Sequence, residues 1–145
     1  MPRVTAPGEI CELKINDAVS GETITFYYEA PTPQEQVIYN KSLIRRKGNK
    51  IENTAPETNQ KWGRKILRGF EYGNFAKRVD GKEVLYASDS VHPNYDPNWK
   101  ELVCTYAMDL VMFLAMTVFG GNSRDIDIFG ENNETEEIKE DAGKN

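Results

Sequence analysis

The side chains that most often do chemistry in proteins are sparse in this chain and form no recognisable catalytic pattern. The sequence holds one histidine, His92, in the polar stretch Ser90–Asn94, and two cysteines, Cys11 and Cys104, far apart inside apolar patterns. A zinc site needs closely spaced Cys and His ligands. We therefore expect His92 to be structural or solvated and the cysteines to be free thiols, with a disulfide left open.

Nucleophilic and cofactor-dependent chemistry also lacks its usual motifs. The chain has no Gly-x-Ser-x-Gly turn, no Gly-x-Gly-x-x-Gly and no Gly-Lys-Ser/Thr phosphate loop, and Asp125-Ile126-Asp127 lacks the rest of a calcium loop. A Ser-His-Asp triad built from distant positions stays open, because triads are recognised by geometry. We expect a protein that is not an enzyme and that uses no cofactor or metal.

Charge is arranged in blocks along the chain. The 145 residues include 18 basic and 23 acidic side chains, for a net charge of −5. Residues 41–82 carry 12 basic and 4 acidic groups, whereas residues 122–145 carry 3 and 8. The basic block could contact nucleic-acid phosphates or an acidic protein, or be a solvated face. The acidic tail could also fold back on it within the same chain.

The apolar periodicity predicts an α+β fold in which two antiparallel β-hairpins pack against three helices. Alternation over residues 10–15 and 23–28 predicts the first hairpin. Asp80-Gly81, between residues 75–79 and 83–87, predicts the second hairpin with a type I′ turn.

Three capping patterns predict the starts of the helices. Thr32-Pro33-Gln34-Glu35 opens a helix to about Arg46, Thr54-Ala55-Pro56-Glu57 opens one that includes Phe70, and Asp96-Pro97 opens one that ends at Phe119 before Gly120-Gly121. Residues 1–121 are expected to form one domain and residues 122–145 a disordered acidic tail. The longest apolar run, residues 107–119, is shorter than a spanning helix of roughly 20 residues, so we expect a soluble, cytoplasmic protein.

Two helix surfaces are candidates for binding a partner, although a solvated face would also explain the first and simple burial would also explain the second. The second helix carries a basic stripe at helical spacing, made of Lys61, Arg64, Lys65 and Arg68. On the third helix, the predicted core face is Trp99, Leu102, Val103, Tyr106, Leu110, Phe113, Leu114 and Val118. Its other side carries Met108, Met112, Met116 and Phe119, and methionine-rich faces adapt to apolar helices of varied sequence.

The order of these parts resembles that of the tail assembly chaperones of long-tailed bacteriophages and prophages, from about Glu9 to Gly121. The resemblance is carried by Phe26-Tyr27-Tyr28-Glu29, Pro31-Thr32-Pro33-Gln34-Glu35, Trp62, Gly69-Phe70-Glu71, Asp80-Gly81-Lys82-Glu83-Val84 and Trp99-Lys100-Glu101-Leu102. It implies a non-enzymatic virion assembly protein of the host cytoplasm that keeps a tape-measure protein soluble and helps recruit tail-tube subunits.

On that resemblance, the methionine face would cover apolar helix and the basic stripe would meet acidic residues. Another phage structural role, such as a tail-tube or head–tail connector component, is an alternative. From a different class, a nucleic-acid-binding or regulatory protein would use the basic block of residues 41–82. The sequence leaves homo-oligomerisation open.

Overall fold

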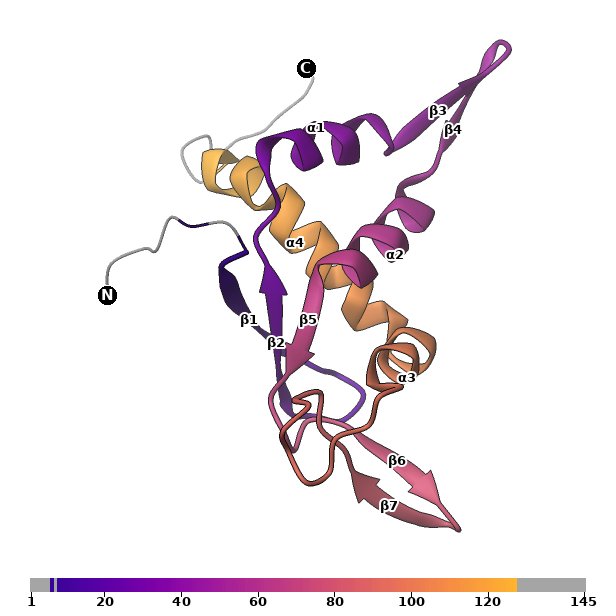
Figure 1. Cartoon of the computed structure of the whole chain (residues 1–145). Helices are drawn as coiled ribbons and strands as arrows, with labels where there is room; N and C mark the ends of the chain where they lie inside the picture. Colours follow the sequence, from indigo (N-terminus) through magenta and orange to yellow (C-terminus); the bar gives the residue numbers. More distant parts are fainter. Residues whose placement is uncertain (1–5, 7, 128–145) are drawn as a thin grey trace.

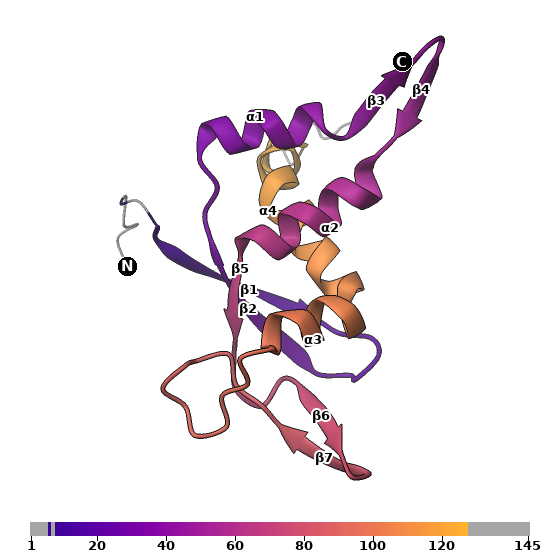
Figure 2. The ribbon, with the colours of Figure 1, turned by 45° about the vertical axis from the view of Figure 1, so that its right-hand side comes forward.

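The computed structural model describes Ala6 and residues 8–127, and it confirms the α+β class (Figure 1). Over these residues the chain forms four helices and three small antiparallel sheets. A three-stranded sheet and the crossing helices make the body, and two hairpins project from opposite ends of it (Figure 2). The number of helices and sheets therefore exceeds the prediction.

The first predicted hairpin is confirmed and is the core of the central sheet. β1 (Ile10–Asn16) pairs with β2 (Thr23–Glu29) in antiparallel register, with Leu13 opposite Phe26. β5 (Leu67–Phe70) pairs with the other edge of β2. Because β2 is the middle strand, Phe26 is fully buried.

α1 (Pro33–Lys41) begins at the predicted capping box. The Thr32 hydroxyl accepts a hydrogen bond from the Glu35 N–H at 3.2 Å, and the Glu35 carboxylate accepts one from the Thr32 N–H at 2.9 Å. These bonds satisfy two amide groups that a helix start leaves unpaired. The start of this helix is therefore determined by residues next to it in the sequence.

The predicted end of that helix near Arg46 is wrong. The chain leaves α1 at Lys41 and forms β3 (Ile44–Lys47), which pairs with β4 (Lys50–Asn53). Gly48, with φ 63°, makes the tight turn between them. A glycine at positive φ suits the first central position of a two-residue hairpin loop as well as a helix end, and here it turns a hairpin.

α2 (Ala55–Ile66) also ends earlier than predicted, because Leu67 is extended and starts β5. In β5 the side chains of Leu67 and Phe70 are buried, so sheet pairing and burial outweigh the helical periodicity. Thr54 precedes α2, yet its side chain caps no α2 amide. Its hydroxyl instead donates to the Ser42 carbonyl at 2.5 Å.

The second predicted hairpin is confirmed, including its turn. β6 (Ala76–Val79) pairs with β7 (Lys82–Leu85), and both turn residues have positive φ, 53° at Asp80 and 80° at Gly81. This is the backbone that a type I′ turn requires. The hairpin forms a sheet of its own and does not join the central sheet.

The third predicted helix is two helices. α3 (Trp99–Tyr106) and the start of α4 (Met108–Asp127) are bent by 92° relative to each other. The Ala107 N–H donates to the Val103 carbonyl at 2.8 Å, and the Ala107 carbonyl accepts from the Leu110 and Val111 N–H groups. One residue thus closes α3 and opens α4.

α4 extends past the predicted helix end. It continues beyond Phe119 to Asp127, so the predicted start of a disordered tail at residue 122 is wrong for residues 122–127. The rest of the predicted tail, residues 128–145, lies outside the described residues. No single helix in the described part of the chain is long and apolar enough to cross a membrane, and α3 with the first part of α4 meets that test only as a pair bent by 92°.

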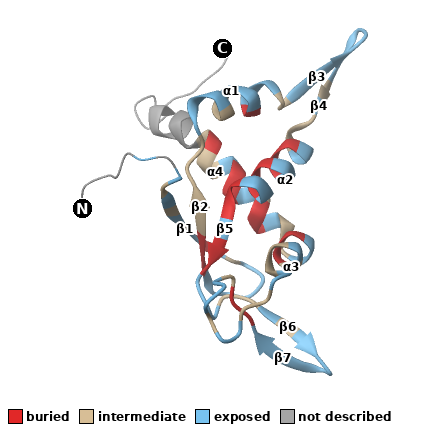
Figure 3. Ribbon diagram, in the orientation of Figure 1, coloured by how far each residue is buried: buried red, intermediate tan, exposed pale blue. Residues whose placement is uncertain are grey.

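The core lies where α2 and α4 cross the central sheet (Figure 3). Tyr39, Trp62 and Phe119 form one aromatic cluster, with the rings of Tyr39 and Phe119 stacked at 4.2 Å. A second cluster surrounds Phe70 and includes Phe75, Tyr86 and Trp99. Cys104 is buried nearby in this core, and both cysteines are free thiols, as predicted.

Candidate functional site

The four residues of the predicted basic stripe do not form one free cationic surface. Lys61, Arg64 and Lys65 lie on α2, whereas Arg68 lies on β5. Lys61 and Lys65 place their ammonium groups 5.9 Å and 4.6 Å from the centre of the Trp62 ring. These cations are partly engaged with an aromatic face in their own helix.

Acidic side chains from three other elements pair with the stripe. Arg64 forms an ion pair with Glu101 of α3, and Lys65 lies 3.6 Å from Glu35 of α1. Arg68 lies 2.7 Å from Glu29 of β2. The pairs are solvent-exposed, so each adds at most about 1 kcal/mol to stability, but together they offset much of the local positive charge.

The predicted methionine face is only partly accessible. Phe119 is 3% exposed and belongs to the core, so it does not lie on an accessible face of α4. Met108 and Met112 are half-buried, and Met108 packs against the core. Met116 is exposed over about half of its surface, at 52%.

The exposed face of α4 instead includes Phe113, which the sequence pattern assigned to the core. Asp109, Phe113 and Met116 lie at i, i+4 and i+7 and are all exposed. Tyr106, at the end of α3, is 83% exposed although it was predicted to be buried. Because of the bend at Ala107, the side chains of α4 do not point in the directions expected for one continuous helix. The predicted core and exposed faces are therefore partly wrong beyond this residue.

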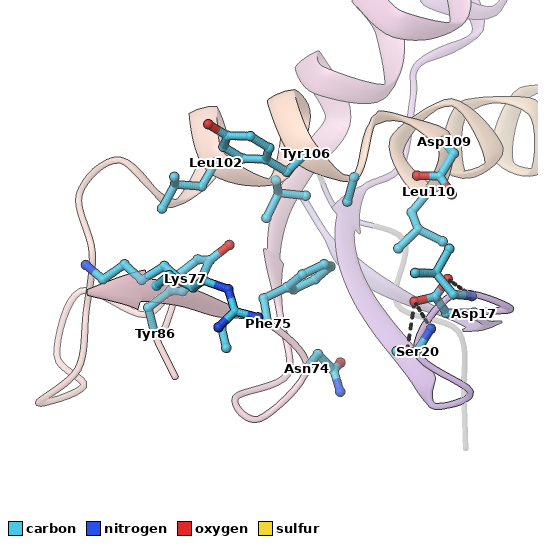
Figure 4. A pocket seen from close by; sticks show the side chains of 15 residues that line it. Asp17, Ser20, Asn74, Phe75, Lys77, Tyr86, Leu102, Tyr106, Asp109 and Leu110 are labelled. Atoms are coloured by element: carbon cyan, nitrogen blue, oxygen red, sulfur yellow. Dashed lines mark hydrogen bonds between the residues drawn. The ribbon is translucent and has the colours of Figure 1, made fainter. Parts of the chain in front are cut away.

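A groove opens at the junction of α3 and α4, between these helices and the strands below them (Figure 4). It has a volume of about 650 Å³ and adjoins a second hollow of about 500 Å³ along β1 and α4. We call the two together the α4 groove. Its lining includes Asp17, Val19, Phe75, Lys77, Arg78, Tyr86, Leu102, Tyr106, Asp109, Leu110 and Phe113.

The floor of the α4 groove is apolar and its rim is charged. In Figure 4, Leu102 and Tyr106 face Phe75 across the hollow, and Leu110 lies at the end nearest Asp17. Val19, in the turn between β1 and β2, is 88% exposed on this rim. Such a combination of aromatic and aliphatic surface is typical of a site that takes an apolar segment of a partner.

The charged groups on the rim are held by local hydrogen bonds. The Ser20 hydroxyl donates to Asp17 at 2.8 Å and, with the Val19 and Ser20 N–H groups, holds the pKa of Asp17 below its usual value. Lys77 lies 2.8 Å from Asp96 and lowers the pKa of that carboxyl. Burial, with the nearby Asp96 charge, raises the pKa of Tyr86 to about 12.

His92 lies away from this groove in the loop that precedes α3. Its Nδ1 accepts a hydrogen bond from the Asn94 N–H at 3.0 Å, and its ring packs 4.2 Å from that of Tyr72. These contacts agree with the predicted structural role. No cluster of His, Cys, Asp and Glu within the described ranges could hold a metal ion.

Tyr106 and Phe113 are the groove residues that sequence reasoning missed. One signal could have indicated them: Asp109 interrupts an apolar run, and an acidic side chain suits the first turn of a new helix. Comparison with protein-family models, with curated proteins and with solved structures gives no match for this chain, so a functional assignment must come from its own surfaces.

Proposed function

We propose that this protein binds an apolar segment of another protein in the α4 groove, and that it acts as a tail assembly chaperone for a tape-measure or tail-tube protein. The observation that carries the proposal is the exposure of Tyr106 and Phe113, which line an apolar groove, with Met116 exposed on the same face of α4 as Phe113. Large apolar side chains gathered in this way are costly in water unless a partner covers them.

The geometry suits a helical or extended guest. Phe113 and Met116 share one face of α4, and Tyr106 lines the groove at the end of α3, beside the bend. A guest helix would place anchors at i, i+3, i+4 and i+7 against such a strip. Tape-measure proteins are long and helical, which is the reason for favouring them as guests.

The nucleic-acid alternative has less support from the predicted basic stripe. Three of its four cations pair with carboxylates, namely Glu29, Glu35 and Glu101. Phosphate contacts there would have to compete with these carboxylates. A salt series with duplex DNA tests this alternative, because binding through the stripe would weaken steeply with salt and on alanine substitution of Lys61, Arg64, Lys65 and Arg68.

Co-expression with a tape-measure fragment tests the proposed function. The unaltered protein should keep the fragment in the soluble fraction, and the variant Phe113→Glu should lose this effect while keeping its circular dichroism spectrum. Val91→Glu is a matched control, because Val91 is 85% exposed in a loop that does not line the groove. Failure of the unaltered protein to solubilise any fragment would refute the chaperone proposal.

A further inference from the structure

A second feature, independent of the α4 groove, is the hairpin of β3 and β4, which projects beyond α1 and α2 (Figures 1 and 2). We call residues 44–53 the basic arm. All of its residues are exposed except Glu52, which is half-buried. A two-stranded ribbon of this length is marginally stable in water, so the arm would gain stability from being covered.

The base of the basic arm is fixed to the body. The Thr54 N–H donates to the Leu43 carbonyl at 3.0 Å, and the hydroxyls of Thr54 and Thr58 both donate to the Ser42 carbonyl at 2.5 Å. Thr58 is buried in α2. These bonds hold the arm away from the body and present both of its faces.

One face of the arm combines apolar and cationic side chains. The register pairs Ile44 with Asn53 and Arg46 with Ile51, so these four residues share a face. Ile44 and Ile51 are 60% and 63% exposed. A ligand for this face therefore needs apolar groups as well as negative charge.

Only some of the cations of the arm form ion pairs within the described ranges. Arg45 pairs with Glu52 at 2.7 Å across the strands. Among the residues that the structure describes, no carboxylate pairs with Arg46, Lys47 or Lys50. Arg46 lies on the face of the two exposed isoleucines, whereas Lys47 and Lys50 face each other next to the turn on the opposite face. Two like charges directly opposite each other are unfavourable, so an acidic ligand at the tip would relieve their repulsion.

We propose that the basic arm binds the acidic segment of residues 128–141 in the same chain. This segment contains six acidic residues and one basic residue, Lys139. It also contains Ile138 near its far end, which could cover the exposed isoleucines of the arm. The segment thus offers both kinds of group that a ligand for this face needs.

The segment is long enough to reach the arm, although α4 ends on the other side of α1 (Figure 1). Phe119 stacks on Tyr39 in the last turn of α1, and the Gln36 side chain donates to the Phe119 carbonyl at 3.0 Å. The strands of the arm are about 13 Å long, and α4 runs about 12 Å from Phe119 to Asp127. An extended segment of this length spans up to about 46 Å, so it can reach the tip of the arm.

Tethering favours the segment over a free ligand. A segment attached by a short linker has an effective concentration in the millimolar range. A nucleic acid would neutralise the cations but leave Ile44 and Ile51 uncovered, so the mixed face favours the acidic peptide. Because charge dominates this contact, an acidic partner protein or high salt would displace the segment and expose the arm.

A spin label on the full chain tests this contact. The label is attached at Glu137→Cys in a Cys11→Ser background, because Cys104 is buried. At low salt, the amide NMR signals of residues 44–53 should lose most of their intensity, whereas those of residues 76–85 in the other hairpin should not. The loss should disappear in about 0.5 M salt.

Two matched variants show whether the arm is the binding surface. Arg46 and Arg78 are each the third residue of the first strand of a projecting hairpin, and Arg46 lies on the mixed face of the arm. Arg46→Glu should restore the signals of the arm, and Arg78→Glu should leave them broadened. Equal broadening in the two variants would overturn the proposal, as would the absence of broadening in the unaltered arm.

Two further measurements test whether the arm binds a second copy of the chain or DNA instead of the segment of its own chain. When spin-labelled protein without ¹⁵N is mixed with ¹⁵N-labelled protein without the spin label, the arm signals should stay sharp. Broadening there would mean that a second copy supplies the segment, and the same-chain contact would be wrong. Duplex DNA should bind more tightly when the six acidic residues are replaced by amides, and equal binding with and without this change would overturn the proposal.

Discussion

Gly63 of α2 lies directly against Val111 of α4, where the two helices cross. A Cβ atom at Gly63 would lie 2.7 Å from Val111 Cγ1 and would also meet the backbone of that residue. The helices can approach this closely because Gly63 has no side chain. The crossing holds α4 in the position from which it forms one wall of the α4 groove.

Gly63→Ala should therefore destabilise the protein despite the better helix propensity of alanine. We expect a loss of about 1–3 kcal/mol in the free energy of unfolding, from overpacking at the crossing. Gly120→Ala is the control, because its Cβ would meet no atom within 4 Å. That change should stabilise α4 by up to about 1 kcal/mol, and urea denaturation of both variants checks the contrast. Similar effects of the two changes would show that α2 and α4 are not in tight contact.

Truncation of Phe119 should separate its core role from the predicted role in partner binding. Phe119→Ala removes a buried ring that packs on Tyr39 and Trp62, so we expect a loss of about 3–5 kcal/mol in unfolding free energy. Met116→Ala, on the exposed face of α4, should cost less than about 1 kcal/mol. Urea denaturation measures both values. If Phe119→Ala cost no more than Met116→Ala, the burial of Phe119 would be in doubt.

The features that sequence predicted well are those that a few neighbouring residues determine. The residues of the Thr32 capping box and of the Asp80-Gly81 turn determine the backbone conformation at their own positions, and both features are as predicted. The errors occur where distant packing decides the conformation. Leu67 and Phe70 have helical spacing with α2, yet they pair with β2 in the central sheet. At Ala107 the helix ends although no glycine or proline stands there.

The same distinction explains what was missed at the candidate site. The cations of α2 were correctly placed on one face of a helix up to Lys65, yet their partners Glu35 and Glu101 come from helices distant in sequence. The exposure of Phe113 follows from the bend at Ala107, which periodicity cannot encode. Surface composition could be predicted from the sequence, but the pairing of surfaces could not.

The two thiols should differ in reactivity. Cys104 is buried, and this burial raises the pKa of its thiol, whereas Cys11 is partly accessible at the edge strand β1. A thiolate is the reactive form, so both effects protect Cys104. A disulfide-exchange reagent at pH 8 should label one thiol quickly in the native protein and the second only in urea. Rapid labelling of both thiols in the native protein would contradict the described position of α3.

The ion pair between Lys77 and Asp96 should make stability depend on pH in the acid range. The Lys77 ammonium lies 2.8 Å from Asp96 Oδ2, and the Asn98 N–H donates to Oδ1 at 2.8 Å. These bonds, with that from Lys77 the larger cause, hold the pKa of Asp96 below its ordinary value of 3.8. The folded protein therefore favours the ionised carboxylate. Its contribution is fully present above the unfolded pKa and is lost as the pH falls through the lowered folded pKa.

Asp96→Asn keeps an acceptor for the Asn98 N–H and removes the charge, so it isolates the ionic part of this contact. At pH 7 we expect the variant to be less stable than the unaltered protein by about 1 kcal/mol, with the difference shrinking below about pH 4. A double-mutant cycle with Lys77→Met, measured by urea denaturation at pH 7 and near pH 3, checks the assignment. Coupling between the two residues should be present at pH 7 and weaker near pH 3. Additive effects at pH 7 would mean that Lys77 does not anchor the β6–β7 hairpin to the loop before α3 through this carboxylate.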